Sequence, residues 1–175
     1  MSDLALYSSI ARIVFLISTS AGYAQDFPKL DVSPMDKASF NADAGSVSIY
    51  YSRPQLQERS LDKLAPKGEV WRTGANEATT ISFSKDATVA GKKVKAGVYS
   101  LFTIPGDNNW TIILNSNANQ WGAYQYDETL DVLRGTATVT TDKKSIEAFS
   151  MAFKKDGSLV MAWGTTRIHI PITFQ

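Results

Sequence analysis

The chain is organised around residues 71–79, Trp71-Arg72-Thr73-Gly74-Ala75-Asn76-Glu77-Ala78-Thr79. This is its densest run of specific polar chemistry, and segments with apolar patterns lie on both sides of it. Gly74 stands where a turn would need conformational freedom. The stretch therefore indicates the end of one strand, a turn and the start of a second strand, with Arg, Asn and Glu side chains held at the junction.

Segments that alternate between apolar and polar residues surround this junction. Residues 46–52 place Val47, Ile49 and Tyr51 on one parity and serines on the other, which is typical of a half-buried strand. Residues 79–84 alternate in the same way, whereas residues 25–45 are expected to form an extended lead that ends in a turn. Further strands or hairpins are expected at residues 89–94, 96–104, 110–115, 132–141, 146–153, 159–163 and 167–173.

This succession of short strands, with turn signals between them and almost no helical period, predicts an all-β fold. The expected architecture is a single antiparallel β-sandwich or jelly roll, and a flattened β-barrel is the alternative. Asp156-Gly157 predicts a two-residue type I′ hairpin. Pro171 predicts an edge strand or a strand end, because proline cannot donate to a ladder.

The bulk composition excludes several classes of protein. The chain is 43% hydrophobic and 20% charged, which is typical of one globular domain. Its net charge of +1 gives no electrostatic footprint for nucleic acid or for an anionic membrane. The absence of cysteine excludes a thiol nucleophile, a cysteine-ligated zinc and disulfides, and the single histidine, His169, excludes a multi-histidine metal site within one chain. We therefore expect no metal and no cofactor.

Residues 1–24 have the pattern of a secretory signal. Arg12 precedes a short apolar run at residues 13–17, and Gly22 and Ala24 supply the small residues of a cleavage site after Ala24. The run is too short to span a bilayer, which needs about 20 apolar residues. We expect a mature domain of residues 25–175 with no membrane segment, located in the periplasm or outside the cell. An N-terminal helix of the folded domain is the alternative.

Strand parity places two charged residues on apolar faces. If the strand at residues 79–84 is regular back to Glu77, then Glu77 shares the side of the apolar residues, and Arg53 likewise follows the apolar parity of residues 46–52. A charge buried alone is costly. We therefore expect Glu77 and Arg53 to pair with each other or with Arg72 or Arg134, or to line a solvent-filled mouth. A bulge at Gly74 would reverse this parity.

Two interpretations of this cluster remain open. In the first, Arg72, Asn76 and Glu77 form a hydrogen-bonded corner in which Gly74 adopts a positive φ. In the second, they form the polar floor of a pocket with aromatic walls, which suits a small polar ligand such as a sugar. The candidate ligand-binding residues are Arg53, Trp71, Arg72, Asn76, Glu77, Tyr99, Trp121, Tyr124 and Arg134.

Three functions follow from these interpretations. The first is non-catalytic binding of a small polar or carbohydrate-like ligand. The second is a carboxylate-dependent hydrolase, in which Glu77 and either Asp127 or Asp131 would form a glycosidase pair with carboxyl groups about 5–9 Å apart. The third is a structural or interaction domain of the cell envelope. No residue is assigned a catalytic role, and the oligomeric state stays open.

Several motifs together resemble a family of secreted bacterial proteins, the domain of unknown function DUF2911. The resemblance covers residues 33–173, and it implies one secreted domain with no assigned reaction. Some members carry a lipoprotein cysteine that this chain lacks, so a soluble exported state is expected here. The motifs are Ser33-Pro34, Tyr51-Ser52-Arg53-Pro54, Val70 to Thr79 with its specific Trp-Arg-Thr-Gly-Ala-Asn-Glu block, Ala96 to Leu101, Trp110 to Asn115, Trp121-Gly122-Ala123-Tyr124 and Asp131 to Arg134.

Overall fold

The computed structural model describes residues 27–174, so the predicted signal segment at residues 1–24 lies outside the described residues. The described chain confirms the all-β prediction, with a seven-stranded antiparallel sheet in the order β1-β2-β3-β6-β7-β8-β9 and a small sheet in the order β10-β4-β5. The strands are β1 (Met35–Ala42), β2 (Gly45–Ser52), β3 (Thr79–Phe83), β4 (Ala87–Val89), β5 (Lys92–Val94), β6 (Gly97–Ile104), β7 (Asn109–Asn115), β8 (Asp131–Phe153), β9 (Leu159–Ile170) and β10 (Ile172–Phe174), and the helical elements are α1 (Leu61–Leu64) and a 3-10 turn (Glu128–Leu130).

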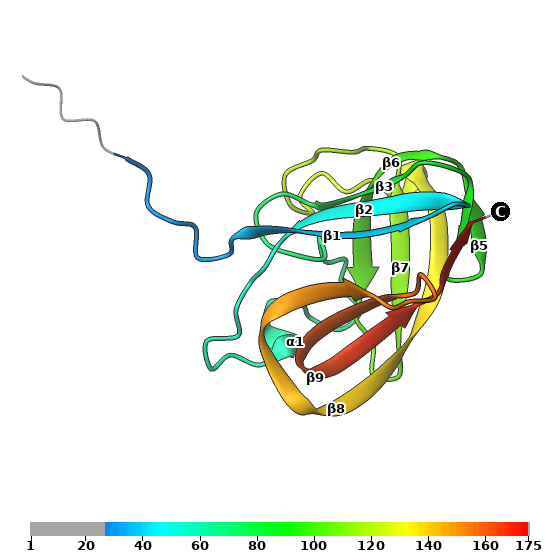
Figure 1. Ribbon diagram of the computed structural model, residues 1–175. Coiled ribbons are helices and arrows are strands. Elements are labelled where there is room, and N and C mark those ends of the chain that lie inside the picture. The colour runs from blue at the N-terminus through cyan, green and yellow to red at the C-terminus, as the bar shows by residue number, and fades with distance from the viewer. Residues whose placement is uncertain (1–26, 175) are drawn as a thin grey trace, which may run out of the picture.

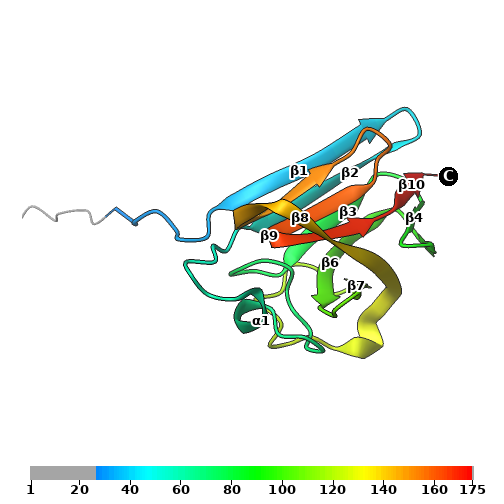
Figure 2. The same ribbon diagram turned by 90° about the horizontal axis from the view of Figure 1, so that it is seen from below.

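The main sheet curls on itself because β8 is long and bent. β8 has 23 residues, and it pairs with β7 from Asp131 to Thr138 and with β9 from Thr138 to Phe153. Its register with β9 shifts between Thr141 and Ile146 and again between Ile146 and Ser150, and such irregularities let a strand bend. The second half returns towards β2, where Gln55 bridges to Ala148. Figures 1 and 2 show the resulting half-barrel, in which the β8–β9 hairpin lies over the β1–β2 end of the sheet.

The core lies inside this curl and is built around four aromatic side chains. Trp71 stacks on Trp163 with ring centroids 5.5 Å apart and an interplanar angle of 15°. Phe149 and Trp110 meet the Trp71 ring edge-on at centroid distances of 5.1 and 6.0 Å. Stacked and edge-to-face contacts are the arrangements that aromatic rings prefer. Trp71 therefore belongs to the core, although it opens the polar stretch at residues 71–79.

The outer face of the sheet is polar on β2 and β3 and apolar on β6 and β7. The register places Tyr50 of β2 opposite Thr80 of β3, and Thr80 opposite Ser100 of β6. Phe102 of β6 and Ile113 of β7 are also opposite each other, and both are completely buried. The segment between β7 and β8 covers this apolar part of the face. The polar part on β2 and β3 stays accessible beside it.

The small sheet begins where the main sheet ends. Pro171 separates β9 from β10, which confirms the predicted strand end, and its carbonyl accepts a hydrogen bond of 2.9 Å from Ala90 N. β10 then pairs with β4, from Ile172 opposite Val89 to Phe174 opposite Ala87. Within residues 27–174, no helix is long and apolar enough to cross a membrane.

Two local expectations differ from the structure. β1 pairs with β2 along all of its eight residues, although that segment was expected to be an extended lead. The apolar alternation is weak there because Ala38 is the only fully buried residue of β1. The turn at Asp156-Gly157 is not type I′, because Gly157 alone of the two residues has a positive φ, 85°. Gly157 N donates to Lys154 O at 3.1 Å, so this is a longer hairpin loop that ends on a left-handed glycine.

Candidate functional site

Residues 71–79 form a loop, and only Thr79 of this stretch belongs to β3. Thr73 and Asn76 have φ values of 56° and 58°, in the left-handed region that non-glycine residues seldom occupy. Hydrogen bonds inside the loop maintain this shape: Thr79 N donates to Arg72 O at 3.1 Å, and Thr79 Oγ1 donates to Thr73 O at 2.8 Å. Thr73 Oγ1 also lies 3.1 Å from Thr103 Oγ1 on β6, so the loop is fixed to the sheet.

Gly74 is required for close packing rather than for the conformational freedom that its sequence context indicates. Its φ is not positive, so the turn does not depend on its conformational freedom. A Cβ at this position would lie 3.0 Å from Ser52 O and 3.1 Å from Thr79 Oγ1. Gly74 therefore allows the loop to lie directly against the end of β2.

The expectation that Glu77 points inward is wrong. β3 begins at Thr79, so Glu77 lies in the loop outside the alternating strand, and it is exposed. Among the described residues, no cationic side chain lies within ion-pair distance of Glu77. Asn76 Nδ2 instead donates to Asp31 Oδ2 at 3.0 Å, and the Glu77 backbone bridges to Trp121. The predicted ion-paired corner of Arg72, Asn76 and Glu77 does not form.

Arg53 is half-buried and has a carboxylate partner, but that partner is Asp36 rather than Glu77. Arg53 Nη1 lies 3.1 Å from Asp36 Oδ2 on β1. On the other side, Arg53 Nε donates to Phe149 O at 3.0 Å and Nη2 donates to Ser150 Oγ at 2.8 Å. Arg53 thus connects β1 and the end of β2 to the returning half of β8, and among the described residues it forms no hydrogen bond or ion pair with residues 71–79.

Arg134 belongs to a separate polar cluster on the outer face. Its Nε lies 2.7 Å from Asp131 Oδ2, and its Nη2 lies 3.3 Å from Glu128 Oε1 and donates to Tyr126 Oη at 2.6 Å. Burial and the hydrogen bond that Tyr126 donates to Asp131 raise the pKa of Tyr126 to about 12. Asp127 is engaged nearby, where hydrogen bonds from Thr129 lower its pKa. Both carboxylates that were considered as partners of Glu77 therefore have other contacts.

The predicted aromatic residues lie in three different places. Trp71 is in the core, and Tyr99 is half-buried beside Phe83 with its hydroxyl donating to Lys95 O at 3.0 Å. Trp121 and Tyr124, in contrast, are 60% and 84% exposed. They lie on the segment between β7 and β8, which is joined to the 71–79 loop. The predicted single aromatic wall is therefore not formed by these four residues.

Arg72 lies at the same join between the two loops. It is half-buried, and its Nη1 is 3.6 Å from the point where a Cβ on Gly122 would stand. Ala78 N donates to Gln120 O at 3.0 Å, which fixes the two loops to each other. The residues that the structure brings together are therefore Arg72, Asn76, Glu77, Trp121 and Tyr124, whereas Arg53, Trp71, Tyr99 and Arg134 lie elsewhere.

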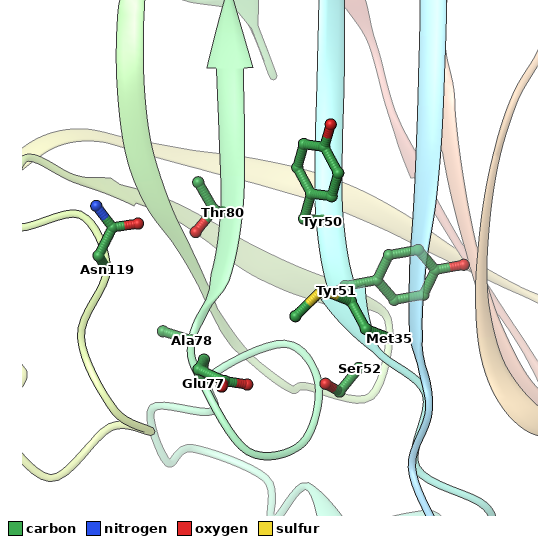
Figure 3. Close-up of a pocket in the computed structure, with 8 residues that line it drawn as sticks. All are labelled: Met35, Tyr50, Tyr51, Ser52, Glu77, Ala78, Thr80 and Asn119. Carbon is green, nitrogen blue, oxygen red and sulfur yellow. The ribbon is translucent and has the colours of Figure 1, made fainter. Parts of the chain in front are cut away.

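A cavity of about 290 Å³ lies where this loop pair meets the polar outer face of β2 and β3. Figure 3 shows Tyr50 and Thr80 on neighbouring strands, Asn119 on the far side of Thr80, and the Glu77 carboxylate pointing from the loop towards Ser52. Tyr50 is 45% exposed, so part of its ring is available to a ligand. The residues that line the cavity are Met35, Tyr50, Tyr51, Ser52, Glu77, Ala78, Thr80 and Asn119.

Of these lining residues, only Glu77 is among the candidates predicted from the sequence. The alternation in residues 46–52 already placed Tyr50 with the serines, on the face opposite Tyr51, so an exposed aromatic on a polar face was a usable signal. Asn119 gave no such signal. It has a φ of 63° in an irregular segment, and its position beside β3 follows from tertiary contacts.

Two observations bear on metal binding and on relatives. Within residues 27–174, no group of three or more His, Asp or Glu side chains is placed to hold a metal ion. Comparison with curated proteins and with solved structures gave no match. A family model described as "Protein of unknown function (DUF2911)" matches residues 33–172, which is most of the chain and includes both loops of the candidate site. The chain therefore belongs to the DUF2911 family.

Proposed function

We propose that this chain is a binding domain that takes a small polar, carbohydrate-like ligand in the cavity between the 71–79 loop and the outer face of β2 and β3. The lining of the cavity is the observation that carries this proposal. The Tyr50 ring, the Thr80 hydroxyl, the Asn119 amide and the Glu77 carboxylate surround one open volume. An apolar surface combined with a few convergent polar groups is the usual composition of a site for a small ligand.

The chemistry of the lining favours hydroxyl groups on the ligand. The Glu77 carboxylate accepts hydrogen bonds, the Asn119 amide both donates and accepts, and the Thr80 hydroxyl does both. The volume of about 290 Å³ is at the lower end of the range for ligand pockets, which is roughly 300–1,000 Å³. A single sugar ring or a comparable polyol fits this description better than a large apolar compound.

Binding is favoured over hydrolysis because the cavity lining contains one carboxylate. A glycosidase needs two carboxyl groups across the scissile bond. Glu77 is the only acidic residue among those that line this cavity, while Asp131 is held by Arg134 and Asp127 caps the 3-10 turn. A purely structural role for the 71–79 loop is the other alternative, and the experiment below separates it from ligand binding.

A thermal-shift screen with neutral sugars and polyols tests the proposal. A ligand at about 100 times its Kd stabilises a protein by about 2.7 kcal/mol, which is roughly 5–10 °C in Tm for a domain of this size. Glu77→Gln is expected to weaken the binding, whereas the control Glu69→Gln changes an exposed carboxylate outside the cavity lining. Undiminished binding to folded Glu77→Gln, or no shift with any sugar, would contradict the cavity as the site.

We also propose that the domain is exported after cleavage behind Ala24. Support comes from the Arg12 charge, the short apolar run and the small residues at positions 22 and 24. N-terminal sequencing of the chain from a fractionated bacterial culture tests this. A mature start at Gln25 in the periplasmic or extracellular fraction is expected, and an intact Met1 in the cytosol would refute it.

A further inference from the structure

Two buried polar atoms without partners lie at the join between the 71–79 loop and the segment between β7 and β8. Among the described residues, the buried side-chain atoms that make no hydrogen bond are Arg72 Nε and Gln120 Oε1. Gln120 is 5% exposed, and its Nε2 donates to Asn117 O at 2.7 Å while its Oε1 accepts nothing. Buried polar groups are nearly always hydrogen-bonded in folded proteins, so a donor and an acceptor left open at one join need an explanation.

Arg72 also has no carboxylate partner, unlike several other arginines of the chain. Arg53 and Arg134 form ion pairs at 3.1 and 2.7 Å, and Arg167 lies 3.6 Å from Asp142. Within residues 27–174, no acidic side chain lies within 4.0 Å of the Arg72 guanidinium. A guanidinium presents a planar fork of donors that matches a carboxylate or a phosphate, and here the protein itself does not supply one.

The exposed ring of Tyr124 lies near this guanidinium, and the exposed Trp121 is on the same segment. A Cβ on Gly122 would lie 3.1 Å from the Tyr124 ring and 3.6 Å from Arg72 Nη1. The Tyr124 ring and the Arg72 guanidinium therefore both pack close to Gly122. Trp121, the adjacent residue, bridges to Glu77 and is 60% exposed. Exposed rings next to an unpaired cation form a surface on which a ring-shaped ligand with an anionic group can be held.

We propose that Arg72, Trp121 and Tyr124 form a second binding site, which takes the oxyanion of an acidic saccharide. Arg72 receives the carboxylate or phosphate oxygens through its terminal guanidinium nitrogens, and the exposed rings of Trp121 and Tyr124 contact the sugar ring. Gln120 Oε1 is buried, so it lies behind this surface and does not contact the ligand. This site does not depend on the cavity that Glu77 lines. If both sites are occupied by one molecule, that molecule is an acidic oligosaccharide.

Tryptophan fluorescence gives a direct measurement of this site. The four tryptophans of the sequence are Trp71, Trp110 and Trp163, which are at most 6% exposed, and Trp121. Acrylamide quenching of the native protein therefore reports mainly on Trp121. The probes are glucuronate, glucose 6-phosphate, glucose and inorganic phosphate at millimolar concentrations. The first two probes distinguish a carboxylate from a phosphate, and the last two test the ring and the anion separately.

We expect at least one of the two acidic sugars to protect Trp121 from quenching, and glucose to give no protection. Arg72→Gln is expected to weaken that binding about tenfold or more, because it removes charge-assisted hydrogen bonds. Arg59→Gln is the matched control, because Arg59 is exposed and donates only to the carbonyls of Leu56 and Gln55. Trp121→Ala, a change of an exposed side chain, tests the same site should Arg72→Gln fold poorly.

The outcomes separate this proposal from the one for the cavity. Loss of acidic-sugar binding in Arg72→Gln and Trp121→Ala, with Glu77→Gln unaffected, supports a second site whether or not neutral sugars bind. Equal binding of glucose and glucuronate, or acidic-sugar binding that survives in both folded variants, overturns it. Failure of every probe to protect Trp121 also overturns it.

Discussion

Arg53 and Asp36 form an ion pair of 3.1 Å that joins the edge strand β1 to the end of β2, and the same guanidinium reaches the returning half of β8. The curl of the sheet is therefore stabilised by a hydrogen-bonded contact as well as by an apolar core. The Arg53 and Asp36 side chains are 34% and 42% exposed, so solvent screening weakens the ion pair itself. The bonds to Phe149 O and Ser150 Oγ connect strands that are far apart in the sheet order, and we expect them to matter more.

Arg53→Ala is expected to lower the free energy of unfolding by about 1–3 kcal/mol, because the polar groups on β8 lose their partner. Asp36→Asn, which removes only the ion pair, is expected to cost less than about 1 kcal/mol. Urea unfolding followed by circular dichroism measures both values. Arg59→Ala is the control, with bonds only to nearby carbonyls. A cost for Arg53→Ala no larger than that of the control would show that this contact does not hold the curl.

Trp71→Ala is expected to be among the most damaging single changes, with a loss of about 3–5 kcal/mol. The ring stacks on Trp163 and meets Phe149 and Trp110 edge-on, so its removal leaves a cavity at the centre of the core. Chemical unfolding and the near-ultraviolet circular dichroism of the aromatic cluster both measure this. Trp121→Ala is the matched control because it is 60% exposed, and it is expected to change stability by less than about 0.5 kcal/mol. Similar losses for the two variants would place Trp71 outside the core.

The strands could be predicted wherever one face is buried. β2 and β3 alternate because Val47, Ile49 and Ile81 point into the core while Ser48, Thr80 and Ser82 face outwards. β1 could not be found in this way, because an edge strand with one fully buried residue has no apolar parity to detect. The curl of β8 was also hidden, since its bends depend on register shifts with β9 rather than on local composition.

The candidate site was predicted in part, for a related reason. Parity can be extrapolated only within a strand, and β3 begins at Thr79, after Glu77. The sequence therefore located the polar loop but gave Glu77 the wrong orientation. The partner of Arg53 could not be inferred either, because Asp36 lies on the strand that the sequence did not reveal. Tertiary pairing decides contacts of this kind.

Alkaline titration is expected to reveal Tyr126 as a late-titrating tyrosine, with a pKa of about 12. Burial disfavours the phenolate, and the bond to Asp131 further favours the protonated form. Because the folded pKa is above the ordinary value of about 10, this group stabilises the fold fully below pH 10. That contribution is lost as the pH rises from about 10 to about 12, since the unfolded chain ionises first.

The difference in phenolate absorbance between the wild type and Tyr126→Phe measures this pKa, with far-ultraviolet circular dichroism recorded at each pH to establish that both remain folded. The midpoint of the difference curve is expected near pH 12, and the decline in stability between pH 10 and pH 12 is expected to be shallower in Tyr126→Phe. Tyr124→Phe is the control, because Tyr124 is 84% exposed. A midpoint near pH 10 for the Tyr126 difference would mean that the Tyr126–Asp131 bond does not form in solution.

Asn76 contributes both a left-handed backbone conformation and a side-chain hydrogen bond to the 71–79 loop beside the cavity. Substitutions at this position separate the two contributions. Asn76→Ala loses both the tolerance for φ of 58° and the bond to Asp31, whereas Asn76→Gly loses only the bond. The left-handed conformation costs an ordinary residue about 1–2 kcal/mol, so Ala is expected to be less stable than Gly by about 1 kcal/mol. Asp31→Ala removes the bond from the other side and leaves the Asn76 backbone unchanged. Urea unfolding of the three variants ranks their stabilities. An Asn76→Ala variant equal to or more stable than Asn76→Gly would contradict the left-handed conformation.

Glu77 follows Asn76 directly. Asn76→Ala is therefore also expected to weaken the binding of any ligand that depends on the Glu77 carboxylate, and Asn76→Gly is expected to weaken that binding less.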